Sequence, residues 1–148
     1  MHQLAQLNIA RMKFDFEAPE MAGFVARLDE INALADSAAG FVWRWIAEGE
    51  AATAENHFDA DLLVNLSVWQ DLETLRAFVF KSSHNQVMAQ RKQWFERMQQ
   101  AYTVLWWVPA GHLPSLQEAR ERLDLLREKG PTAQAFTFRQ NYPAPTQT

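Results

Sequence analysis

The sequence predicts a single α+β domain in which an antiparallel sheet packs against amphipathic helices. Its length of 148 residues is usual for one domain with one hydrophobic core. Along the chain, the spacing of apolar residues changes between a period of two, typical of strands, and a period of about 3.6, typical of helices. Hydrophobic residues make up 48% of the chain and charged residues 22%, which favours a globular protein over a disordered or membrane-spanning one.

The first strand and the first helix are predicted before Gly40. Residues 4–12 alternate, with Leu7 and Ile9 on one face, as in a strand. Pro19 suits the first position of the helix that follows. The apolar stripe of this helix consists of Met21, Phe24, Val25, Leu28, Ile31 and Ala35. Gly40 can then serve the turn into the next strand.

The second and third strands are predicted at residues 40–46 and 62–69, as an antiparallel hairpin with a long polar connection. In the second strand, alternation places Phe41, Trp43 and Trp45 on one face and Val42, Arg44 and Ile46 on the other. Asp71 is the expected N-cap of a helix that continues through Val79. A further capped helical stripe is expected at Val87, Met88, Arg91, Trp94, Phe95 and Met98.

The C-terminal part is predicted to contain a strand, a helix and a short strand. The strand covers residues 102–108, and Ser115 with Glu118 forms a capping box that begins the helix. Gly130 ends this helix, and a short strand follows at residues 135–138. We expect residues 1–140 to form one domain and residues 141–148 a flexible tail.

The resulting order β-α-β-β-α-β, followed by an extra helix and strand, is the split βαβ pattern of ferredoxin-like folds. In that fold, helices would cover one face of the antiparallel sheet. The predicted strands nevertheless carry large apolar residues on both faces. We therefore expect the sheet of a second subunit to cover the other face, so that the protein is a homodimer.

Charge and composition exclude several classes of partner. The net charge is −4, and no basic tract indicates nucleic-acid binding. The chain has no cysteine, which excludes disulfides and thiolate sites and fits a cytoplasmic location. No membrane interaction is expected, because no signal-peptide pattern or apolar run of roughly 18 residues occurs. The four histidines are too widely spaced for a metal motif, so no metal site is expected.

A resemblance to a known family is carried by residues 4–11, 40–43, 68–78, 83–84 and 94–95. These segments look like the bacterial domain-of-unknown-function family numbered 3291, over nearly the whole chain. That family is similar to the dimeric α/β-barrel superfamily, whose members include antibiotic-biosynthesis and haem-degrading monooxygenases and muconolactone-isomerase-like proteins. The resemblance implies the fold and the dimer more than a reaction, since one such scaffold hosts many functions.

The resemblance also implies catalytic candidates. In the haem-degrading branch, an Asn on the first strand, a Trp near the end of the third and a His in the following helical region act together. Asn8, Trp69 and His84 occupy comparable places here. Haem is therefore a candidate cofactor, although no cofactor is required by the sequence itself.

The residues themselves leave two interpretations open for each candidate. His84 is predicted at a helix start, where a neutral imidazole is favoured. Its ring could ligate a cofactor or transfer a proton, with Met88 and Arg91 beside it, or it could simply contact loop backbone. Asn8 could orient a ligand or tie neighbouring strands together. Arg44 could anchor a substrate carboxylate or form a salt bridge. Trp43, Trp94 and Trp106 could line a cavity for a flat hydrophobic molecule or belong to the core or dimer interface.

Two classes of function follow. The first is a small monooxygenase-like enzyme acting on a hydrophobic aromatic or haem-like substrate inside a dry aromatic cavity. The second is a non-catalytic module that binds a hydrophobic small molecule, because no pair of titratable groups with opposed roles is visible.

Overall fold

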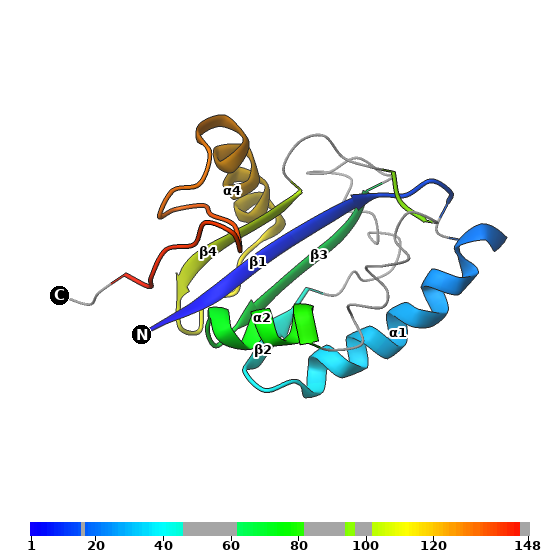
Figure 1. Cartoon of the computed structure of the whole chain (residues 1–148), viewed down its shortest axis with the longest axis horizontal. Helices are drawn as coiled ribbons and strands as arrows, with labels where there is room; N and C mark the ends of the chain where they lie inside the picture. Colours follow the sequence, from blue (N-terminus) through cyan, green and yellow to red (C-terminus); the bar gives the residue numbers. More distant parts are fainter. Residues whose placement is uncertain (16, 46–61, 82–93, 97–101, 146–148) are drawn as a thin grey trace.

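Strand β1 (His2–Arg11) runs through the centre of a four-stranded, open antiparallel sheet (Figure 1). It pairs with β3 (Leu62–Trp69) on one side and with β4 (Thr103–Pro109) on the other. Strand β2 (Phe41–Arg44) pairs with β3, so that the strand order is β2-β3-β1-β4. The computed structural model describes residues 1–15, 17–45, 62–81, 94–96 and 102–145.

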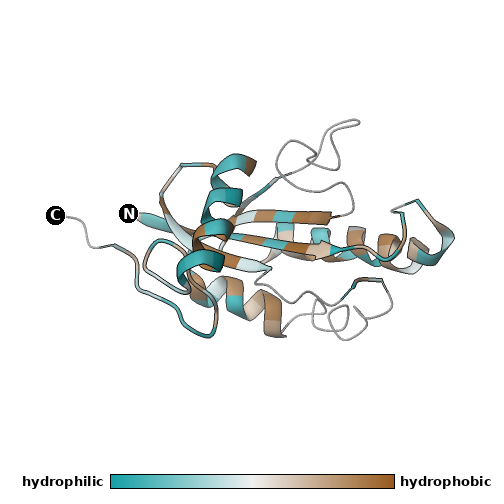
Figure 2. Ribbon diagram, turned by 90° about the horizontal axis from the view of Figure 1, so that it is seen from above, coloured by the Kyte–Doolittle hydropathy of each residue, from teal (hydrophilic) through white to brown (hydrophobic). Residues whose placement is uncertain are grey.

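Helices lie on both sides of this sheet (Figures 1 and 2). A short 3-10 turn at Pro19–Met21 leads into α1 (Ala22–Ser37), and α2 (Leu72–Lys81) follows β3. These two helices pack on one side of the sheet, which we call the α1/α2 side. Helix α4 (Leu116–Lys129) packs on the other, the α4 side. The alternating order of strands and helices agrees with the α+β class predicted from the sequence.

The α4 side of the sheet is almost wholly apolar. Its buried cluster joins three strands to α4 and consists of Ala5, Leu7, Ile9, Leu62, Leu66, Val68, Val104, Trp106, Val108, Ala119, Leu123, Leu126 and Ala135. The expectation that the helices would cover only one face of the sheet is therefore wrong. An amphipathic helix near the C-terminus already covers part of the face that was assigned to a second subunit, and the dimer stays a prediction.

Two aromatic clusters fill the α1/α2 side. Near the start of α1, Phe24 contacts Trp94 and Phe95, with ring centroids 5.5 and 4.9 Å apart. Near α2, Trp69 contacts Phe41 and Phe78, with ring centroids 5.4 and 5.2 Å apart. Much of the large apolar surface noticed in the sequence is thus used to attach α1 and α2 to the sheet.

The helix ends predicted at Asp71, Ser115 and Gly130 are present, while the start of the helix predicted before Val87 lies outside the described residues. The backbone N–H of Thr74 donates to Asp71 Oδ1 at 2.8 Å, and that of Glu118 donates to Ser115 Oγ at 3.1 Å. Gly130 ends α4 with a φ of 74°, which a residue with a side chain rarely adopts. Gly40 has a φ of 83° and approaches the side chain of Thr74, so the turn before β2 requires glycine.

Three local predictions are wrong. A register shift between Phe41 and Trp43 puts these two residues on opposite faces of β2, because a bulge breaks the alternation. Trp94–Glu96 is not helical, since its backbone pairs with residues 11–13. The expected strand at residues 135–138 is reduced to isolated bridges, of Phe136 with Leu105 and of Ala135 with Thr132. Apolar spacing alone cannot distinguish a short extended segment such as Trp94–Glu96 from a helix.

Candidate functional site

Polar side chains form a row across the α1/α2 side of the sheet, between the two aromatic clusters. They occupy alternate positions on three neighbouring strands, and the pairing register places Gln6 opposite Ser67 and Asn8 opposite Asn65. Asn8 also lies opposite Thr103 of β4. We call these five residues the polar row: Gln6, Asn8, Asn65, Ser67 and Thr103.

The buried end of the polar row is a chain of hydrogen bonds. Gln6 Nε2 donates to Ser67 Oγ and to Asn65 Oδ1, both at 2.7 Å. The indole N–H of Trp69 donates to the same Ser67 oxygen at 2.9 Å. Gln6 is 8% and Ser67 6% exposed, and they are the buried polar residues of the described chain. The β1 and β3 side chains are therefore fixed relative to the Trp69 ring.

One end of the Gln6 amide has no partner within the described residues. Both of its contacts are made by the same terminal atom, so the other terminal atom, Oε1, accepts no hydrogen bond from this part of the chain. Buried polar atoms are normally paired, because an unpaired one loses about 1–3 kcal/mol of solvation on burial. Within the described part of the chain, the row thus offers a fixed hydrogen-bonding group that accepts no hydrogen bond.

The other end of the polar row is open to solvent. Asn8 is half-buried and its Nδ2 donates to Thr103 Oγ1 at 2.6 Å, while Asn65 is exposed. This contact is the cross-strand tie that was one of the two interpretations of Asn8. The amide oxygen of Asn8 receives no hydrogen bond from the described residues. Solvent, or a small molecule, can therefore reach the row at the Asn8–Asn65 end.

Arg44 lies on the same side of the sheet, opposite Ser67, but it is engaged in an ion pair. Its Nε lies 2.8 Å from Asp36 Oδ1 at the end of α1. This hydrogen bond lowers the pKa of the Asp36 carboxyl below its usual value. The salt-bridge interpretation of Arg44 is thus present within one chain, and it attaches α1 to β2.

The structure does not bring the remaining predicted residues together. Trp69 and Asn8 share the α1/α2 side, but Trp69 lies opposite Leu4 and Asn8 lies four residue pairs further along β1. Trp43 and Trp106 face the α4 side, and Trp94 packs under α1. Three predicted residues, His84, Met88 and Arg91, lie outside the described residues.

Gln6 and Ser67 are the site residues that sequence reasoning missed. Both occupy strand positions where alternation already placed a polar residue, so they looked like ordinary solvent-facing positions. A signal was nevertheless present: Ser67 stands two residues before Trp69 on the same face, and a buried indole N–H needs an acceptor. Large aromatics on the same face as small polar residues indicate a buried polar group.

No group of three or more His, Cys, Asp or Glu side chains in the described part of the chain is placed to hold a metal ion. None of the helices among the described residues is both long and apolar enough to cross a membrane.

Comparisons with known proteins support the family suggested by the sequence. The crystal structure of a protein of unknown function from Nitrosomonas europaea aligns with a TM-score of 0.50 and 15% identity, covering 78% of this chain and 97% of that one, which shows a shared fold. No protein of curated function matches the chain. Residues 3–148 match the family described as Domain of unknown function (DUF3291). The chain therefore belongs to the DUF3291 family.

Proposed function

We propose that this DUF3291 protein binds a small, flat, largely apolar molecule that carries one hydrogen-bonding edge, on the α1/α2 side of its sheet. The observation that carries this proposal is the end of the Gln6 amide that has no partner among the described residues, in a residue that is 8% exposed. The hydrogen-bonding edge of the ligand would contact this amide and Asn8, whose amide oxygen is also without a described donor.

The surroundings of the polar row suit such a molecule. Phe24, Trp94 and Phe95 lie toward one end of the row, and Trp69 and Phe78 toward the other. Ligand sites are typically apolar and aromatic with a few fixed polar groups. The hydrogen bonds from Gln6 and Trp69 to Ser67 hold those polar groups in place before a ligand arrives, which reduces the entropy lost on binding.

The proposal includes a ferredoxin-like arrangement, supported by the strand order β2-β3-β1-β4 with every neighbouring pair antiparallel.

The proposal also includes a homodimer of dimeric α/β-barrel type. Trp43, Trp45 and Val64 are only partly buried on the α4 side, at the half of the sheet near β2. A second copy packed there would cover them, and sedimentation at micromolar concentration should then give a dimer; a single-chain particle would contradict it.

A catalytic use of the same site, by oxygenation of the bound molecule, is the second candidate. It is favoured by the fact that Asn8 and Trp69 lie on the side that carries the polar row. The described histidines, His2 and His112, lie at the start of β1 and beside α4, so neither provides a haem ligand at the row. No step is therefore assigned to haem. If the protein oxidises 1,4-dihydroxynaphthalene under oxygen, and the His84→Ala variant does not, the result would favour the catalytic function.

Calorimetric titration with 1-naphthol and with naphthalene tests the binding proposal. The two probes differ only in a hydroxyl group, so their affinity ratio measures the contribution of the hydrogen-bonding edge. In Gln6→Leu, we expect the affinity for 1-naphthol to fall about tenfold, as for the loss of one buried hydrogen bond, while naphthalene binds as before.

The matched control is Gln70→Leu, which removes an exposed amide directly after β3. It should leave both affinities unchanged, and thermal unfolding of both variants checks that each is folded. If Gln6→Leu lowers the affinities for naphthalene and 1-naphthol equally, or lowers neither affinity, the polar row does not contact the ligand.

A further inference from the structure

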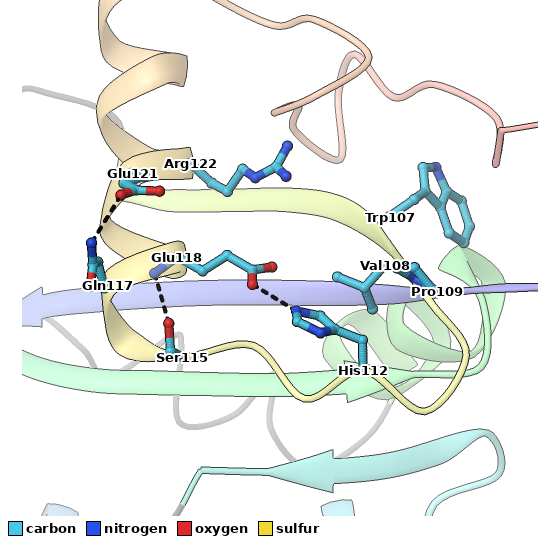
Figure 3. Close-up of a pocket in the computed structure, with 9 residues that line it drawn as sticks. All are labelled: Trp107, Val108, Pro109, His112, Ser115, Gln117, Glu118, Glu121 and Arg122. Carbon is cyan, nitrogen blue, oxygen red and sulfur yellow. Dashed lines mark hydrogen bonds and ion pairs between the residues drawn. The ribbon is translucent and has the colours of Figure 1, made fainter.

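A separate pocket lies on the opposite side of the sheet, between the end of β4 and the start of α4 (Figure 3). Its volume is about 480 Å³, which is enough for a small metabolite. Trp107, Val108 and Pro109 form one wall, and α4 contributes charged and polar side chains to the other. None of the residues of the polar row lines it.

The carboxyl group of Glu118 makes two hydrogen bonds in this pocket. The indole N–H of the buried Trp106 donates to Oε2 at 2.8 Å, and Nε2 of His112 lies 2.7 Å from Oε1. Ser115 therefore satisfies one half of the predicted capping box, while the carboxylate that should complete it is directed toward the pocket instead. Because Nε2 of His112 contacts Glu118, only Nδ1 of that ring is left for another partner.

Arg122 lies one helical turn after Glu118, yet the two do not form an ion pair. A Glu followed four residues later by a basic residue is the favourable order for such a pair in a helix. Instead, Arg122 Nη1 donates to the backbone carbonyl of Gln134 at 2.8 Å. Figure 3 shows the two side chains projecting from α4 in the same direction, with no interaction marked between them. Opposite charges on one helical face are thus kept apart, with the pocket beside them.

We propose that this pocket binds a small carboxylic acid that also carries a hydrogen-bond donor, as 2-hydroxy acids and amino acids do. The guanidinium of Arg122 takes the carboxylate, since Arg has further donors in its planar fork and only a neutral carbonyl among its described partners. The Glu118–His112 pair accepts the hydroxyl or ammonium donor at the other end. Val108 and Pro109 contact the carbon atoms between the two groups.

The indole N–H of Trp106 provides a direct signal, because it is bonded to Glu118. We would titrate 15N-labelled protein with L-lactate and with acetate, following this resonance, which is assigned by its loss in Trp106→Phe. Lactate should give a saturable shift and acetate a weaker response, because acetate lacks the donor. The Arg122→Gln substitution should lower the affinity for lactate about tenfold, as expected for loss of a charge-assisted hydrogen bond.

Two further variants complete the test. His112→Ala should reduce the affinity for lactate to that for acetate, whereas Arg120→Gln, which changes an arginine of α4 that does not line the pocket, should behave like the unmodified protein. The absence of a saturable shift with lactate would overturn the proposal. An unchanged lactate affinity in Arg122→Gln would also overturn it.

Discussion

The two sides of the sheet are built from the same strands but have opposite chemistry. On β1, Leu7 and Ile9 face α4 and are 0% and 1% exposed, in a cluster that is wholly apolar. Gln6 and Asn8 alternate with them and face α1 and α2, where they belong to the polar row. A one-residue shift in the register of β1 would exchange these two surfaces.

This difference bears on how each side contributes to stability and on the function proposed for the polar row. The buried cluster on the α4 side consists of apolar residues, and the hydrogen bond from Trp106 links it to a residue outside the cluster, Glu118. Such burial of apolar surface is what stabilises a domain most. The α1/α2 side places hydrogen-bonding groups in the middle of its apolar contacts, where each loses solvation and must be paired. A side with such groups is expected to have been shaped by what it binds, and its residues should affect stability less than binding.

The largest expected effect comes from opening the α4 side. Leu7→Ala should lower the free energy of unfolding by about 2–5 kcal/mol, because a fully buried leucine leaves a cavity. Gln6→Leu, at the adjacent position on the other side, should lower it by only about 1 kcal/mol. Urea denaturation of the two variants measures both values, and similar losses would mean that the two sides do not differ in this way.

A substitution at the turn before β2 should have the next largest effect. In Gly40→Ala the added methyl group would overlap the side chain of Thr74, and the φ of 83° is unfavourable for alanine. We expect the free energy of unfolding to fall by about 1–3 kcal/mol, measured by thermal denaturation. Gly111→Ala is the matched control, because that glycine also has a positive φ but has open space around it. Equal losses would show that only the backbone angle matters.

The two buried indoles allow a matched comparison across the sheet. Trp106→Phe and Trp69→Phe each keep an aromatic ring and remove one N–H, from Glu118 and from Ser67 respectively. We expect Trp106→Phe to lower the free energy of unfolding by about 1.5–3 kcal/mol, because the acceptor of its indole N–H is a carboxylate. We expect Trp69→Phe to lower it by about 1 kcal/mol. Urea denaturation at neutral pH would show the order, and the reverse order would contradict this assignment of partners.

The smallest effect is expected at the Arg44–Asp36 ion pair, which is partly exposed. Arg44 lowers the pKa of Asp36, so the pair stabilises the fold above the unfolded-state pKa of Asp and loses this contribution as pH falls through the lower folded-state value. Asp36→Asn should lower the free energy of unfolding by less than about 1 kcal/mol near neutral pH. The difference should disappear in acid, and a difference that persists there would have another cause.

The sequence predicted the elements with strong local signals and missed those determined by distant contacts. Strand β3 and the caps at Asp71 and Ser115 follow from alternation and capping chemistry, and each is present. The pairing of Trp94–Glu96 with residues 11–13 involves segments far apart in the chain, and no local pattern indicates it. The bulge in β2 is equally invisible, because it depends on how Phe41 and Trp43 pack on opposite faces.

The candidate site was predicted only in part, for the same reason. Asn8 and Trp69 were singled out by resemblance, and both lie on the side that carries the polar row. Their contacts depend on which residues the register places beside them, and Ser67 and Thr103 have no signal of their own. The sequence does not indicate that α4 of the same chain packs on this face of the sheet, because α4 follows the complete β-α-β-β-α-β pattern.

The central claim, that the α1/α2 side binds ligands through its polar row, is tested most directly by the indole N–H of Trp69. This group donates to Ser67, whereas the corresponding group of Trp106 lies on the other side of the sheet. In an NMR titration with 1-naphthol, the resonance of Trp69 should shift and saturate while that of Trp106 stays in place. A shift confined to Trp106, or none at all, would contradict the account.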